Sequence, residues 1–138
     1  MRRRSSDSVK IRFFRLDYAK VMAELSEYAK NALAKGARAV ILIGSLARGD
    51  YTAFSDADLL IVVDEDPRRP LDRMVDFMDP TLPVDLDLRV YTVRELLRMA
   101  EEGRRLVREA VEHGRLLAGD RGVIEKATRL LRRGDEGV

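Results

Sequence analysis

The chain has 138 residues, of which 46% are hydrophobic and 36% are charged, and it carries a formal net charge of +2 with no cysteine. This length favours a single domain, residues 1–138, around one core. The lack of cysteine excludes a disulfide framework and makes a cytoplasmic location the expectation. No apolar run approaches the roughly 18 residues that a membrane helix needs, so no membrane association is expected, and the basic N-terminus lacks the apolar segment of a secretory signal.

The charged fraction exceeds the average of about 25% and favours a surface of ion pairs of the kind found in thermophiles. Arginines gather near both ends of the chain, at Arg2 to Arg4 and at Arg129, Arg132 and Arg133. Solvated, frayed ends are the usual reason for such clusters, and residues 1–10 and 134–138 are expected to be flexible. The alternative is an electrostatic footprint for a nucleic acid or an acidic partner protein.

The first half of the chain predicts two buried strands between helices. Apolar residues recur at steps of three and four over residues 16–33, which predicts an amphipathic helix. Residues 38–43 are apolar at nearly every position and predict a strand buried on both faces. A short helix, capped by its serine, is expected over residues 45–49. A second strand is expected over residues 56–63, and helical spacing returns over residues 69–78.

The second half predicts two further strands and three helical segments. Residues 84–91 alternate between apolar and polar side chains, which predicts a strand with one apolar face. A threonine and a glutamate in capping-box spacing open a helix over residues 93–102. A helical face over residues 106–114, a short edge strand over 116–118 and an amphipathic helix over 121–132 follow. This order indicates an α/β (or α+β) fold, with a small mixed β-sheet flanked by helices.

Carboxylates at the start of the second strand are the strongest chemical signal. Asp56 and Asp58 stand two positions apart, so a strand period of two places both side chains on one face. Oxygen ligands of this kind suit Mg²⁺. A third carboxylate from a neighbouring strand would complete a two-metal site, which activates an attacking hydroxyl and stabilises leaving pyrophosphate. Asp85 and Asp87, both on the polar face of residues 84–91, are the candidates.

A second signal lies just before these carboxylates. Gly44 and Ser45 stand between a buried strand and a short helix, where glycine lets the backbone approach a ligand and free N–H groups attract phosphate. Arg48 adds a planar cation for a phosphate or for an acid of the site. Taken singly, these features are most often plain helix capping and a surface ion pair. Their joint occurrence at fixed spacing favours a functional site.

The string G-S-x-x-R-G-x-x-x-x-x-S-D-x-D-L over residues 44–59 resembles the signature of the minimal nucleotidyltransferases, a family of the DNA polymerase β superfamily. The resemblance covers roughly residues 36–119 and implies the nucleotidyltransferase fold. It implies ATP as substrate, two Mg²⁺ ions, and a phosphate-binding or metal-binding role for Gly44, Ser45, Asp56, Asp58 and Asp87. Asp87 is preferred to Asp85 because its spacing to Val90-Tyr91-Thr92 resembles the family ending D-x-x-V-Y-T.

The family also implies a partner. Some members pair with a small helical HEPN-type protein as toxin–antitoxin systems and neutralise it, by complex formation or by transferring AMP to one of its tyrosines. The expected function is therefore transfer of AMP from ATP to such a partner, with this chain as the antitoxin. A non-catalytic antitoxin that sequesters its partner is one alternative. A transferase acting on a nucleic-acid end is another, favoured only by the arginine-rich ends. Larger relatives that act on other acceptors carry extra substrate domains, for which this chain has no room.

Two further features are expected to be structural. His113, the only histidine, stands at an expected helix end, where a cation at the C-terminus or a partly buried ring is the simplest reading. Met74, Phe77 and Met78 are expected to pack in the core, with an exposed apolar patch for a partner helix as the alternative.

Overall fold

The centre of the fold is a mixed β-sheet. The computed structural model describes residues 2–52 and 54–136, with side chains described from Asp17 onward. Within this part of the chain the sheet has four strands in the order β3-β2-β1-β4. β1 is antiparallel to both β2 and β4, whereas β2 and β3 are parallel. The strands are β1 (Ala37–Ile43), β2 (Ala57–Val63), β3 (Leu86–Thr92) and β4 (Arg115–Gly119). The predicted fold class is confirmed.

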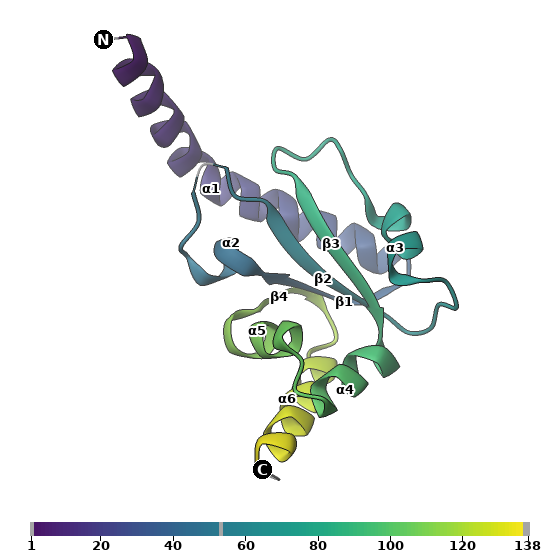
Figure 1. Ribbon diagram of the computed structural model, residues 1–138. Helices are drawn as coiled ribbons and strands as arrows, with labels where there is room; N and C mark the ends of the chain where they lie inside the picture. The colour runs from purple at the N-terminus through teal and green to yellow at the C-terminus, as the bar shows by residue number, and fades with distance from the viewer. Residues whose placement is uncertain (1, 53, 137–138) are drawn as a thin grey trace.

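Helices cover both faces of this sheet (Figure 1). The long helix α1 (Arg2–Ala34) crosses one face. The opposite face is covered by α4 (Val93–Glu101), α5 (Arg105–His113) and α6 (Arg121–Glu136). The short helix α2 (Gly44–Arg48) follows β1 directly. None of the helices in the described residues is long and apolar enough to cross a bilayer.

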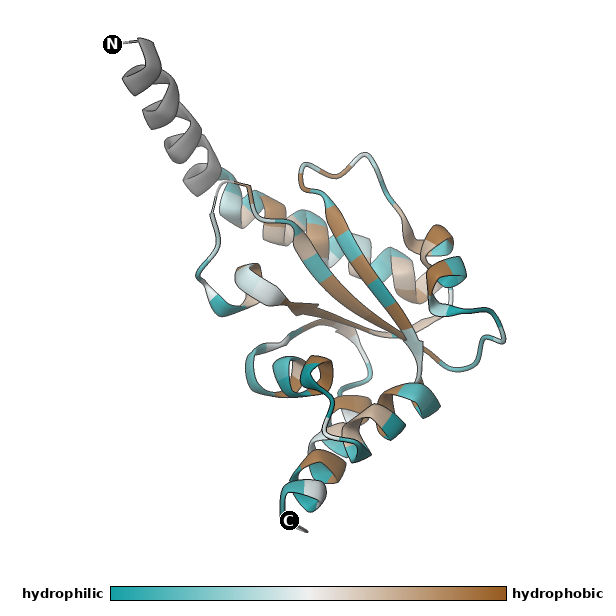
Figure 2. Cartoon of the chain, in the orientation of Figure 1, coloured by the Kyte–Doolittle hydropathy of each residue, from teal (hydrophilic) through white to brown (hydrophobic). Residues whose placement is uncertain are grey.

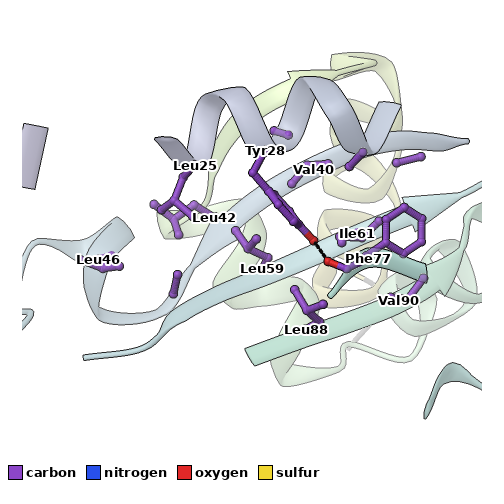
Figure 3. Close-up of a cluster of buried hydrophobic side chains, with 14 of the residues drawn as sticks. Leu25, Tyr28, Val40, Leu42, Leu46, Leu59, Ile61, Phe77, Leu88 and Val90 are labelled. Atoms are coloured by element: carbon purple, nitrogen blue, oxygen red, sulfur yellow. Dashed lines mark hydrogen bonds between the residues drawn. The ribbon is translucent and has the colours of Figure 1, made fainter. Parts of the chain in front are cut away.

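Alternate side chains of β1 and β2 pack into two separate cores, one on each face of the sheet, as the continuous apolar runs predict. Figure 2 shows the hydrophobic residues concentrated on these strands. The core on the α1 side includes Leu25, Val40, Leu42, Leu59, Ile61 and Leu88 (Figure 3). The core on the other side includes Ile41, Leu60, Val62, Leu96, Val107 and Val123. β1 and β2 are therefore fixed from both faces, which makes their ends a rigid base for a site.

The segment expected as one helix over residues 69–78 is shorter and irregular. It forms α3 (Pro70–Arg73) and then a 3₁₀ turn, η1 (Met74–Phe77). The turn ends where the Tyr28 hydroxyl of α1 donates to the carbonyl of Phe77, whose ring is buried (Figure 3). Burial, with a smaller contribution from Asp79, raises the pKa of Tyr28 above its ordinary value, so the hydroxyl stays a donor. Met78 lies beyond the turn and is 60% exposed, so the expectation of core packing is wrong for this residue.

Several strand and helix ends also differ from expectation. β2 begins at Ala57 rather than at residue 56, and β3 begins at Leu86 rather than at residue 84. Pairing between the strands sets these ends: the N–H of Ala57 donates to the carbonyl of Asp85 at 2.8 Å, where the two strands first meet.

α1 begins at Arg2, well before the expected start. The predicted flexibility of residues 1–10 and 134–138 stays a prediction, because residues 1, 137 and 138 and the side chains of 2–16 lie outside the described part.

A buried arginine joins the elements at the far end of β2 and β3. Arg73 is only 3% exposed. Its guanidinium donates to the carbonyls of Val90 and Asp66 and to the carboxylate of Glu95, the last at 2.6 Å. Glu95 also completes the predicted capping box with Thr92 at the start of α4. Hydrogen bonds from Arg73, and then from the Thr92 backbone, lower the pKa of Glu95 below its ordinary value of 4.5.

We expect Glu95→Gln to lower the free energy of unfolding at pH 7 by about 1–3 kcal/mol, because it removes the nearest countercharge of a buried guanidinium and leaves only the Asp66 carboxylate, at 3.9 Å. Glu102→Gln is the control, since Glu102 pairs with Arg104 on the surface and should cost less than about 0.5 kcal/mol. The folded pKa of Glu95 is depressed, so its contribution is present above the unfolded pKa and is lost as the pH falls through the folded value. Denaturant unfolding at a series of pH values from 7 to 3 should show the free energies of unfolding of the unaltered protein and of Glu95→Gln converging as the pH falls. A difference that stays constant with pH would contradict an ion-pair origin.

Candidate functional site

The predicted site residues meet at one end of the sheet. In the register of β1 and β2, Ile43 lies opposite Asp58, so Gly44 and Asp58 are neighbours. In the parallel register of β2 and β3, Asp58 lies opposite Asp87. The end of β1 and the starts of β2 and β3 therefore bring together three positions that are far apart in sequence.

Asp58 and Asp87 form a close carboxylate pair. The pKa of Asp58 is raised above its ordinary value of 3.8, first by burial and then by the charge of Asp87 and a hydrogen bond shared with it. The charge of Asp56 adds to this rise, and the charge of Arg89 opposes it. Asp56 itself precedes β2 and is exposed. This end of the sheet therefore concentrates negative charge in a place where a cation would be stabilised.

Gly44 is required by its contact with Asp58. Its φ of 75° lies in the left-handed region, which lets the chain turn from β1 straight into α2. A Cβ at this position would overlap Oδ2 of Asp58. α2 begins at Gly44, and no side-chain hydrogen bond caps it. The expectation that Ser45 caps this helix is therefore wrong: the glycine turn starts the helix one residue earlier and places Ser45 in its first turn.

The loop between α2 and β2 is held by aromatic and hydroxyl contacts. The ring of Tyr51 stacks on Tyr18 of α1, with centroids 4.7 Å apart. The Ser55 hydroxyl accepts a hydrogen bond of 2.8 Å from the N–H of Thr52, and the N–H of Ser55 donates back to the Thr52 carbonyl. The serine of the S-D-x-D motif thus closes a turn directly before Asp56, which fixes where that carboxylate leaves the loop.

Arg48 lies on the wall of the site and is already paired. Its guanidinium donates to Glu109 of α5 at 2.6 Å and to Asp50 at 3.3 Å. The contact with Glu109 joins α2 to α5 across the opening. α5 lies beside α2 at this end of the sheet (Figure 1). A phosphate-binding role for Arg48 stays a prediction.

A cavity of about 610 Å³ opens at this end of the sheet. Among the residues that line it, Gly44, Arg48 and Asp58 were singled out from the sequence. Four polar residues of the lining were not assigned to the site: Arg89, Arg105, Glu109 and His113. Arg89 could have been found, because it follows Asp87 by two positions on the polar face of β3. Arg105, Glu109 and His113 recur every four residues on one face of α5, but nothing in the sequence says that this face looks toward Asp58.

The sequence matches the nucleotidyltransferase domain family over residues 22–117, which is more than half of the chain. The chain belongs to this family. Two solved structures share the fold of this nucleotidyltransferase. One is a nucleotidyltransferase candidate from Sulfolobus solfataricus, 20% identical, with a TM-score of 0.51 over 75% of this chain and 84% of that one. The other is a toxin–antitoxin complex with AMP-PNP, 17% identical, with a TM-score of 0.53 over 80% of this chain and 87% of that one. No curated protein matches the chain.

The carboxylates of Asp56, Asp58 and Asp87 are chemically suited to bind a divalent cation, but the three do not form a ready coordination site. In residues 2–52 and 54–136, no group of three or more His, Cys, Asp or Glu side chains is arranged to hold a metal ion. The Asp58–Asp87 pair nevertheless supplies hard oxygen ligands and a surplus of negative charge, which Mg²⁺ would compensate. Asp56 is exposed and its charge acts on Asp58, so it stays the candidate for a further ligand.

Gly44→Ala should abolish binding of ATP with Mg²⁺, because the added Cβ displaces the Asp58 carboxylate. Gly36→Ala is a matched control: Gly36 also has a positive φ, of 112°, but nothing lies within 4 Å of an added Cβ. In both variants backbone strain should lower the free energy of unfolding by about 1–3 kcal/mol, but Gly36→Ala should retain binding of ATP with Mg²⁺. Calorimetric titration and thermal melting measure the two effects. Equal binding by both variants would contradict the placement of Asp58 in the site.

Asp87→Asn should weaken Mg²⁺-dependent ATP binding at least tenfold or so, since it removes a charged ligand beside Asp58. Asp85→Asn is the control and should have a small effect, because Asp85 precedes β3 and lines a separate cavity of about 320 Å³ next to Met74 and Met78. Relief of the carboxylate repulsion should leave the melting temperature of Asp87→Asn unchanged or raised. Calorimetric titration of both variants with ATP and Mg²⁺ tests this assignment. A larger loss of affinity in Asp85→Asn than in Asp87→Asn would make Asp85 the third ligand.

Proposed function

We propose that this nucleotidyltransferase transfers AMP from ATP to a partner protein, and that it is the antitoxin of a pair with a small helical HEPN-type protein. The observation that carries the proposal is the carboxylate pair of Asp58 and Asp87 beside the glycine turn, of which Asp58 lines a cavity of about 610 Å³. The fold shared with a toxin–antitoxin complex that contains AMP-PNP supports a protein partner and a nucleotide.

Each group has a defined task in this proposal. The N–H groups at the start of α2, with the Ser45 hydroxyl, bind phosphate oxygens of ATP. Asp56, Asp58 and Asp87 would hold Mg²⁺, which when bound would offset phosphate charge and lower the pKa of the acceptor hydroxyl. The hydroxyl oxygen of the partner's tyrosine bonds to the α-phosphorus, the bond to pyrophosphate breaks, and the hydroxyl proton passes to a base or to water.

The partner would bind over a surface rather than in a second cavity. Large apolar side chains lie exposed on two segments. Phe54 is 84% exposed in the loop before Asp56, next to the site, and Leu71 and Val75 are 74% and 70% exposed on α3 and η1, which follow the other end of β2. Exposed apolar side chains of this size suit a protein interface.

Sequestration without catalysis is the second candidate. It is favoured by the exposed position of Asp56, which leaves only Asp58 and Asp87 in close contact. In this case the nucleotidyltransferase fold would serve as a binding surface, and ATP would at most stabilise it. Transfer to a nucleic-acid end stays a third proposal, resting on the arginine-rich ends of the sequence.

Incubation with labelled ATP, Mg²⁺ and the product of the neighbouring gene should label that product with AMP. Asp58→Asn should remove the labelling, because it takes away the half-buried ligand of the pair. Asp64→Asn should not, because Asp64 pairs with Arg38 on the surface at the other end of β2. A stable complex that takes up no label would favour sequestration. Extension of an RNA 3′ end, with neither binding nor labelling of the protein, would reject the protein acceptor.

A further inference from the structure

One face of α5 forms the wall of the cavity opposite the carboxylates. Arg105, Leu106, Glu109 and His113 line the cavity from this helix, while Asp58 lines it from β2. The contact of Glu109 with Arg48, at 2.6 Å, ties α5 to α2 and holds this face toward the cavity. The cavity therefore has an acidic side at Asp58, next to Arg89 of β3, and a side on α5 where Arg48 offsets the charge of Glu109 and the charge of Arg105 remains.

The cations of this lining differ in how much of their charge is already compensated. Arg48 is paired with both Glu109 and Asp50. Arg89 lies 3.5 Å from Asp87, a contact too long for a strong hydrogen bond. Arg105 is exposed and has no ion pair or hydrogen bond to any residue in the described part of the chain. Arg105 and, in part, Arg89 are therefore the cations that remain available to a ligand.

The arrangement suits a long anion and disfavours a short one. A monophosphate held at the carboxylates through a metal ion would stay on the acidic side of the cavity. A triphosphate is longer, and its terminal phosphates could extend toward α5. Guanidinium groups bind phosphate oxygens in pairs, with planar geometry. The ligand that satisfies both sides of the cavity is therefore one with a polyphosphate tail.

We propose that Arg105 of α5, together with Arg89 of β3, binds the β- and γ-phosphates of the nucleotide, so that this cavity is the subsite for the leaving pyrophosphate. This inference rests on the proposed nucleotidyl transfer and names residues that the sequence signature does not contain. It makes α5 the element that distinguishes a nucleoside triphosphate from a monophosphate. Arg48 and Glu109 then act as positioning residues, because they hold α5 in place.

The test compares two neighbouring arginines at the start of α5, its first residue Arg105 and the preceding Arg104. Arg105→Gln and Arg104→Gln remove the same charge one position apart, but Arg104 pairs with Glu102 on the surface and does not line the cavity. Calorimetry with Mg²⁺ and ATP should give a dissociation constant about tenfold higher for Arg105→Gln, and one within about twofold of the unaltered protein for Arg104→Gln. Affinity for AMP should be unchanged in both variants, and Arg105→Lys should recover part of the affinity for ATP.

Equal ATP affinity in the two variants would overturn the inference, and so would an equal loss for ATP and AMP, which would place the nucleoside rather than the phosphate tail in the cavity. The proposed function has its own control. If Asp56→Ala combined with Asp58→Ala leaves ATP binding unchanged, the metal site is wrong. In that case pyrophosphate alone is the probe: binding that depends on Arg105 but not on Arg104 would still support the anion subsite, and binding that depends on neither would overturn it.

Discussion

The site depends on the register between β2 and β3, which sets the carboxylates of Asp58 and Asp87 opposite each other. The pKa of Asp58 is raised first by burial and then by the charge of Asp87, because two like charges repel in a half-buried position. A one-residue slip of either strand would move one carboxylate to the other face of the sheet, into the apolar core. Everything that fixes this register therefore also fixes the chemistry.

Two devices at opposite ends of the strands maintain the register. At the site, the N–H of Ala57 donates to the carbonyl of Asp85, and Gly44 packs directly against the Asp58 carboxylate. At the far end, buried Arg73 ties the Val90 carbonyl of β3 to the loop after β2 and to Glu95 of α4. Between these ends, apolar side chains on both faces prevent the strands from sliding. The polar groups of the site can thus remain destabilising without loss of the fold.

The charge of the cavity is divided between elements that come from different parts of the chain. The strand ends contribute Asp58 and Arg89, α5 contributes Arg105, and Glu109 of α5 pairs with Arg48 of α2. Such a division suits a ligand that carries both a metal ion and a polyphosphate, because each part meets the opposite charge. It also explains why the motif of residues 44–59 is an incomplete description of the site.

The sequence by itself determined the elements and the local chemistry. Apolar periodicity predicted the strands, the amphipathic helices and the short strand β4, and the Thr92–Glu95 spacing predicted the capping box, because these patterns depend on neighbours along the chain. The spacing of Gly44, Asp56 and Asp58 predicted a site. Only the tertiary structure decided which residues meet: the strand register places Asp87 rather than Asp85 beside Asp58, and the packing of α5 turns Arg105 toward the cavity. These contacts join segments far apart in the chain, so their geometry is set by sheet pairing and core packing, which no local pattern encodes.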